Sequence, residues 1–287
     1  MTETEYIRPQ SLEQALSARA EHPDFTVLCG GTDVLVAANK QPVPAGMIDL
    51  FGLGPLCGID RHSDGTIAIG AATTYADIIN SDLCRRELPA LVAASREIGA
   101  LQIQARGTIG GNIGTSSPVG DSLPVLLAVA AELELASHKR RRTVPYSEFC
   151  TGYRQTLLDA DELIVTVRIP PRSPGLMQFW RKVGPRRAQS ISKVMVAAAA
   201  RTEGGRIAEI RIGLGAVADR PIRAYQTEAA VVGLAPGHLA SSAARAALAD
   251  EITPIDDIRS TARYRLRVAQ NLVAHFVERL SLPAARV

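Results

Sequence analysis

The feature that most constrains the fold is a proline-rich segment, Pro170-Pro171-Arg172-Ser173-Pro174-Gly175, past the middle of the chain. Proline lacks a backbone N–H and fixes φ, so three prolines within five residues neither continue a helix nor lie inside a central strand. The whole chain has 287 residues, which is long for one compact unit. We therefore predict two domains, residues 1–172 and 176–287.

Before this boundary, short strand-like segments alternate with helical ones. Ser11 with Gln14, and Thr74 with Asp77, have the spacing of a capping box at the start of a helix. This pattern indicates mixed α and β structure in the first domain. The expected elements are strands over 25–29, 66–69 and 162–169, helices over 89–99 and 123–131, and a glycine-rich loop over 107–114.

After the boundary, the pattern changes to a hairpin followed by helices. Two strand-like segments, 193–200 and 207–216, flank Gly204-Gly205, which is a hairpin turn signal. Helices are expected over 238–249 and 258–280, and the second has apolar residues at steps of three and four, as a helix with one buried face does. The second domain is therefore predicted to be α+β.

Two glycine pairs are the strongest candidates for a binding site. The first lies in Leu28-Cys29-Gly30-Gly31-Thr32-Asp33, directly after an expected strand, and the second lies in the segment 107–117. Glycine admits φ > 0 and close approach of another group, and consecutive amides in such turns form anion-binding nests. Since no G-x-x-x-x-G-K-[ST] sequence is present, a P-loop is excluded. Each pair alone is more often a plain turn than a phosphate site, and two in one domain leave the two interpretations about equal.

Composition and the remaining motifs argue against several classes of function. The net charge of +3 is too small to predict nucleic acid as the main partner. The longest apolar run, residues 125–131, has seven residues, far below the ~20 of a membrane span. No zinc, iron–sulfur or serine-hydrolase spacing occurs around the cysteines or histidines. We expect a soluble, cytoplasmic chain with no metal of its own.

Asp121, in the segment 118–124, has two compatible interpretations. Its carboxylate follows a phosphate-type loop, where it would accept hydrogen bonds from sugar or ribityl hydroxyls. It also precedes an expected helix with Pro124 in the first turn, which is typical of an N-cap.

The pairing of Gly30-Gly31-Thr32-Asp33 with Thr108-Ile109-Gly110-Gly111-Asn112-Ile113 is distinctive, and further motifs follow it in order. These are Pro118-x-x-Asp121-x-x-Pro124, Gly152-Tyr153-Arg154-x-Thr156, Glu162-Leu163-Ile164, Lys182-Val183-Gly184-x-Arg186-x-Ala188-x-x-Ile191-x-Lys193 and Ala262-x-Tyr264-Arg265. Together, they resemble the FAD-binding medium subunit of the molybdenum hydroxylases, the family of xanthine, carbon monoxide and nicotine dehydrogenases.

The resemblance implies an α+β fold. A two-lobed FAD-binding domain of the vanillyl-alcohol-oxidase (PCMH) type, with lobes at about 1–55 and 56–172, would precede a small antiparallel sheet with a helical bundle. We expect this FAD to bind without a covalent link, because no histidine or tyrosine lies inside either glycine loop and Cys29 is on the phosphate side. The implied cofactor-binding residues are Cys29, Gly30, Gly31, Thr32, Asp33, Val34, Ile98, Thr108, Ile109, Gly110, Gly111, Asn112, Asp121, Ile164 and Lys182.

Each of these residues has an implied role. The pyrophosphate would lie on residues 30–34 and 108–112, which we call the first and second glycine segments. Asp121 would hold the polar chain of the flavin, and Ile98 would pack against its ring. Ile164 and Lys182 would close the site, and Cys29 stands where the family more often has alanine.

The implied activity needs partners. Molybdopterin and two [2Fe–2S] clusters would lie on a large and a small subunit, in a dimer of heterotrimers. Electrons would reach FAD on this chain and leave to an external acceptor, so the resemblance implies binding residues but no catalytic acid or base. Two alternatives stay open from the residues alone: a self-sufficient flavin oxidase or dehydrogenase of the same fold, and a non-catalytic nucleotide-binding scaffold subunit.

Overall fold

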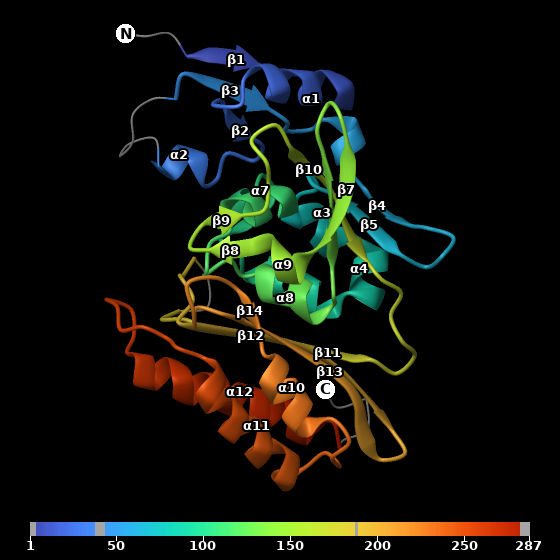
Figure 1. Cartoon of the computed structure of the whole chain (residues 1–287), viewed down its shortest axis with the longest axis vertical. Coiled ribbons are helices and arrows are strands. Elements are labelled where there is room, and N and C mark those ends of the chain that lie inside the picture. Colours follow the sequence, from blue (N-terminus) through green and yellow to red (C-terminus); the bar gives the residue numbers. More distant parts are fainter. Residues whose placement is uncertain (1–3, 38–43, 187–188, 282–287) are drawn as a thin grey trace.

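The computed structural model describes residues 4–37, 44–186 and 189–281 (Figure 1). Three sheets follow one another along the long axis of the molecule, and helices lie between and beside them. Ala188 of the quoted motifs and the end of the predicted second domain, residues 282–287, lie outside the described residues.

The first lobe is a small parallel sheet in the order β1-β3-β2, with α1 connecting β1 to β2. Ser11 caps α1 by accepting a hydrogen bond from the Gln14 N–H at 3.2 Å. The full capping box predicted there is wrong, because the Gln14 side chain accepts from the Gln10 N–H instead. The elements are β1 (Glu5–Ile7), α1 (Leu12–Glu21), β2 (Thr26–Leu28), α2 (Val34–Ala37) and β3 (Gly46–Asp49).

The second lobe is a five-stranded antiparallel sheet in the order β4-β5-β10-β6-β7. Its central strand, β10 (Leu163–Ile169), matches the strand expected over 162–169. Leu163 and Val165 belong to the core of the first lobe, whereas Val167 and Ile169 belong to the core of the second. A register shift between Ile164 and Thr166 accounts for this change of face, since it alters the alternation of side chains.

Short helices pack against this sheet, and two further strands form a small ribbon. Thr74 and Asp77 form the capping box expected at the start of α3. The elements of the second lobe are η1 (Gly54–Leu56), β4 (Ile59–Arg61), β5 (Ile67–Gly70), α3 (Tyr75–Asn80), α4 (Asp82–Glu87), α5 (Pro89–Glu97), α6 (Leu101–Gln104), α7 (Ile109–Thr115), α8 (Leu123–Ala128), β6 (Glu132–Ala136), β7 (Arg141–Pro145), α9 (Tyr146–Phe149), β8 (Cys150–Gly152), β9 (Gln155–Thr156) and β10.

The proline-rich segment leads from β10 into an antiparallel sheet in the order β11-β12-β13-β14. Helices α10, α11 and α12 cover one face, and α8 of the second lobe packs on the other (Figure 1). Close approach to α8 needs a glycine at Gly213, where an added Cβ would lie 2.1 Å from the Pro124 carbonyl oxygen. The elements are β11 (Met177–Val183), β12 (Val194–Glu203), β13 (Arg206–Gly215), β14 (Ile222–Arg223), α10 (Tyr225–Val231), α11 (His238–Glu251) and α12 (Ala262–Arg279).

Strand β12 is buried on both faces. Val194, Val196 and Ala198 pack against the helices of the second domain, and Ala197 and Ala199 face the core of the first. The hairpin expected around Gly204-Gly205 is confirmed, and both glycines have positive φ. The structure also reveals strands β1, β3 and β11, which were not predicted.

Several expected elements differ in extent or in kind, and helix α8, for example, ends at Ala128 rather than 131. Helix α12 begins at Ala262 rather than 258, because Thr261 is its N-cap. Strand β2 spans only Thr26–Leu28 and is half-buried, since one of its edges faces a cavity. The loop expected over 107–114 is wrong, because α7 occupies Ile109–Thr115. The predicted domain and lobe boundaries stay predictions.

Candidate functional site

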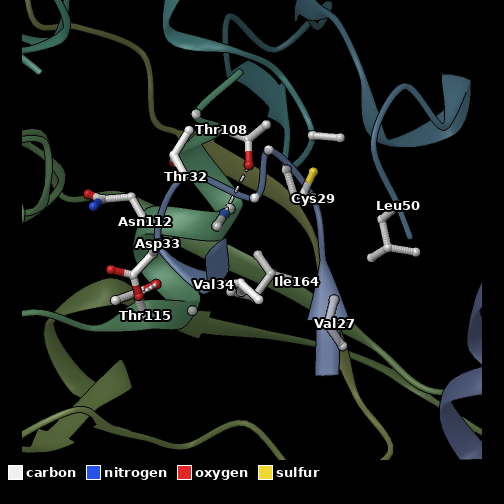
Figure 2. A pocket seen from close by; sticks show the side chains of 18 of the residues that line it. Val27, Cys29, Thr32, Asp33, Val34, Leu50, Thr108, Asn112, Thr115 and Ile164 are labelled. Atoms are coloured by element: carbon white, nitrogen blue, oxygen red, sulfur yellow. Dashed lines mark hydrogen bonds between the residues drawn. The ribbon is translucent and has the colours of Figure 1, made fainter. Parts of the chain in front are cut away.

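A cavity of about 520 Å³ lies where the first lobe meets the second (Figure 2). Its volume is in the range of small-molecule and cofactor sites. The two glycine segments, the end of β2 and the start of β10 all contribute to its wall. The cavity therefore gathers residues that are about 80 to 130 positions apart in the sequence.

The first glycine segment follows β2 directly and owes its shape to two different properties of glycine. Gly31 has φ +75°, a left-handed conformation that other residues rarely adopt. Gly30 touches the second lobe so closely that an added Cβ would lie 1.9 Å from the Arg106 carbonyl oxygen. Thus Gly31 allows the chain to turn, and Gly30 allows the backbones of the two lobes to pack closely together.

The second glycine segment is the first turn of α7. The Thr108 hydroxyl caps the helix by accepting a hydrogen bond from the Gly111 N–H at 3.2 Å. The Ile109 and Gly110 N–H groups donate to the carbonyls of Thr73 and Ala71 at 3.1 and 2.8 Å. The N–H groups of residues 109–112 therefore have partners within the chain, and the anion-binding nest expected in this segment stays a prediction.

Free donors are found in the first segment instead. Within the described ranges, the N–H groups of Gly31, Thr32 and Asp33 make no hydrogen bond to the chain. The α7 side contributes side chains: Asn112 lines the cavity, and its Oδ1 accepts a hydrogen bond from the Ser122 hydroxyl at 2.8 Å. That bond leaves the Asn112 Nδ2 group able to donate to a ligand, so an anion bound here would meet backbone amides of one segment and side chains of the other.

The cavity has a polar and an apolar end. Figure 2 shows Asp33, Asn112 and Thr115 on one side, and Val27 and Leu50 on the other. The Thr115 hydroxyl donates to Asp33 at 3.3 Å. The apolar residues were missed by the sequence analysis because they look like ordinary core positions. They are Phe25, Val27, Leu50, Leu56 and Leu163.

Most of the predicted site residues line this cavity. Ile98 and Ile164 contribute apolar wall, and Ile103, which was not predicted, lies beside them. Ile109 is fully buried in the core and is not part of the wall. The predicted residues that line the cavity are Cys29, Gly30, Gly31, Thr32, Asp33, Val34, Ile98, Thr108, Gly110, Gly111, Asn112 and Ile164.

Asp121 and Lys182 lie together elsewhere and are not among the residues that line the cavity. Lys182 Nζ and the Ser192 hydroxyl both donate to the Asp121 carboxylate, at 2.6 and 2.7 Å. Burial raises the pKa of Asp121, while Lys182 and Ser192 lower it. The predicted N-cap role is wrong: Ser122 is the N-cap residue of α8, and Asp121 instead connects the first domain to the second-domain sheet.

The residues fit a flavin dinucleotide. The cavity offers backbone and side-chain donors for a pyrophosphate at one end and an apolar wall for an aromatic base at the other. Burial raises the pKa of the Cys29 thiol, so this side chain is a neutral wall residue. No metal-binding cluster occurs among the described residues, and within those same ranges no helix is long and apolar enough to cross a membrane.

Comparison with known proteins identifies the family. Residues 2–172 match the model of the FAD binding domain in molybdopterin dehydrogenase, and residues 180–280 match the CO dehydrogenase flavoprotein C-terminal domain. The chain is 32% identical over 272 residues to a xanthine dehydrogenase FAD-binding subunit of Escherichia coli O157:H7, covering 93% of this chain and 92% of that relative. It is 31% identical over 271 residues to the nicotine 6-hydroxylase medium subunit of Paenarthrobacter nicotinovorans, covering 93% and 94%.

Solved structures agree with this result. Carbon monoxide dehydrogenase from Hydrogenophaga pseudoflava superposes with a TM-score of 0.91 at 32% identity, covering 95% of each chain. The α+β fold class, with a FAD-binding domain followed by an antiparallel sheet and helices, is confirmed. The chain therefore belongs to the family of FAD-binding subunits of the molybdopterin dehydrogenases, which are oxidoreductases.

Proposed function

We propose that this chain is the FAD-carrying electron-transfer subunit of a molybdenum hydroxylase. The observation that carries the proposal is the cavity that both glycine segments line, with unpaired N–H groups on one side and an apolar wall on the other. When bound there, FAD supplies the redox chemistry by accepting and releasing electrons. The protein supplies position and electrostatics.

The roles of the residues follow from their surroundings. The amides of the first glycine segment and the Asn112 side chain hold the pyrophosphate. Ile98 and Ile164 pack against the flavin half. For Asp121 and Lys182 we propose a bridging role, because their ion pair joins the two domains rather than lining the cavity.

The partners are a small [2Fe–2S] subunit and a large molybdopterin subunit, assembled as a dimer of heterotrimers. Two relatives are named as medium subunits or chains, of nicotine 6-hydroxylase and carbon monoxide dehydrogenase. FAD held on this chain would take up electrons from those clusters and supply them to an external acceptor. The proposed location is the cytoplasm, in keeping with four cysteines that form no disulfide.

Co-expression of the three chains tests this function. We expect one co-eluting assembly in which the hydroxylase substrate reduces the flavin, and a purified medium chain that binds FAD without turnover. Turnover by the isolated chain at the rate of the assembly would favour the self-sufficient oxidase. A chain that binds no flavin after reconstitution would favour the scaffold alternative.

We also propose that FAD is bound without a covalent link. No histidine or tyrosine lies within either glycine segment, and the Cys29 thiol is buried with a raised pKa. Acid precipitation of the holoprotein followed by filtration should release all the flavin into the filtrate. Yellow colour that stays with the precipitated chain would contradict the proposal.

A further inference from the structure

Arg19 is the one basic side chain among the residues that line the described cavity. It lies in the last turn of α1 and reaches the apolar end, away from the glycine segments. Its Nη1 donates a hydrogen bond to the Phe25 carbonyl oxygen at 2.9 Å. This bond holds the guanidinium beside the start of β2, the strand that continues along the cavity wall to Cys29.

The guanidinium of Arg19 has an incomplete set of partners. Its Nε is buried and has no hydrogen-bond partner within the described chain. Burial lowers the pKa of Arg19, while Asp161 and Asp24 raise it through their charges. Because a buried donor without an acceptor is unfavourable, this nitrogen marks a contact that the chain's own atoms do not complete.

Arg265 provides a useful contrast. Its Nε is also buried without a partner, but its other nitrogens bind the carbonyl oxygens of Lys193 and Ala216 and the Asp257 carboxylate. Arg265 is not among the cavity-lining residues, and its hydrogen bonds connect α12 to other segments of the second domain. Among the described residues, only Arg19 combines a buried nitrogen without a hydrogen-bond partner with a place in the cavity wall.

The chemistry of this end fits a nucleoside. Phosphate donors lie at the opposite end, whereas Phe25, Val27 and Leu50 offer an apolar surface beside the guanidinium. A purine has ring nitrogens that accept hydrogen bonds and an aromatic face on which a guanidinium stacks. Ribose hydroxyls are further acceptors. Arginine suits this task because its planar group donates and stacks at the same time.

We propose that Arg19 binds the adenosine half of FAD and thereby makes the chain select FAD over FMN. The inference rests on the proposed function, in which this cavity holds FAD. FMN lacks the adenylate and so makes no contact with Arg19. The role is one of binding specificity, not of electron transfer.

The test is titration of the full-length apoprotein with FAD and with FMN, followed by flavin fluorescence. In Arg19→Met, which keeps an apolar stem, the Kd for FAD should rise about tenfold while the Kd for FMN stays unchanged. Competition by AMP against FAD should weaken in the same variant. Arg8→Met is the matched control: Arg8 is in the same lobe, its side chain is 62% exposed, and it does not line the cavity.

The outcomes are distinguishable. An unchanged Kd for FAD in Arg19→Met would overturn the inference alone, and so would equal losses for FAD and FMN together with a lower melting temperature. A wild-type chain that binds no FAD would overturn the proposed function and this inference with it. If Arg19→Met does not fold, Arg19→Gln serves in its place, with the same expected selective loss of FAD.

Discussion

The two glycine segments have similar sequences but different structures. The first is a turn at the end of β2 in which Gly31 has φ +75° and three N–H groups have no partner within the described chain. The second is the start of α7, where Gly110 has an ordinary negative φ and its N–H is bonded to the Ala71 carbonyl. The first segment therefore offers backbone donors to a ligand, whereas the second uses its backbone to attach the helix to the second lobe.

The four glycines of the two segments therefore have three different structural roles. Gly31 is needed for its conformation, Gly30 and Gly110 for close backbone packing, and Gly111 for the space beside the cavity. At Gly111 an added Cβ would meet only the Thr108 hydroxyl, at 2.9 Å. Substitutions at these positions should therefore fail for different reasons.

The largest effect is expected at the lobe junction. In Gly30→Ala and Gly110→Val, new side-chain atoms would overlap the Arg106 carbonyl and Ala71 respectively, so the backbone must move. We expect a loss of roughly 3 kcal/mol or more in the free energy of unfolding, measured by denaturation of the apoprotein. Gly54→Ala is the control, because nothing lies within 4 Å of its added Cβ. Wild-type free energies of unfolding in both variants would refute the proposal that these two glycines are needed for close backbone contact.

Gly111→Val should separate binding from folding. Its side chain would project into the cavity, so FAD content after reconstitution should fall to background while the apoprotein stays folded. Flavin absorbance and far-UV circular dichroism measure the two properties. Flavin content equal to wild type would show that the second segment does not face the cofactor.

A smaller effect is expected at Gly31. Alanine in the left-handed conformation of this residue should lower the free energy of unfolding by about 1–2 kcal/mol. Asparagine tolerates this conformation better, so Gly31→Asn should retain more stability than Gly31→Ala. Thermal unfolding of the two apoproteins makes the comparison, and equal melting temperatures would count against the conformational explanation.

The smallest effect is expected for Thr108→Ala. The substitution removes the hydroxyl that caps α7 and should cost about 1 kcal/mol of stability. Thr108→Ser keeps a capping hydroxyl and should behave as wild type in chemical denaturation. A loss in Thr108→Ser as large as that in Thr108→Ala would mean that the threonine methyl group, not the cap, is responsible.

Local signals were predictable because neighbouring residues produce them. The Gly204-Gly205 hairpin and the Thr74 capping box depend on backbone chemistry within a few residues, and both occur as expected. Strands β1 and β3 were not predicted, because each has at most four residues and is stabilised by pairing with distant strands.

By itself, the sequence indicated the family, the α+β fold class and twelve of the residues that line the cavity. Only the tertiary structure decided what each glycine does, that Asp121 pairs with Lys182, and that Arg19 reaches the cavity. The physical reason is that these properties depend on contacts between segments from different lobes and domains. A local backbone conformation requires particular residue types and can be recognised in the sequence. A contact between residues 60 or more positions apart, such as that between Asp121 and Lys182, has no such local pattern.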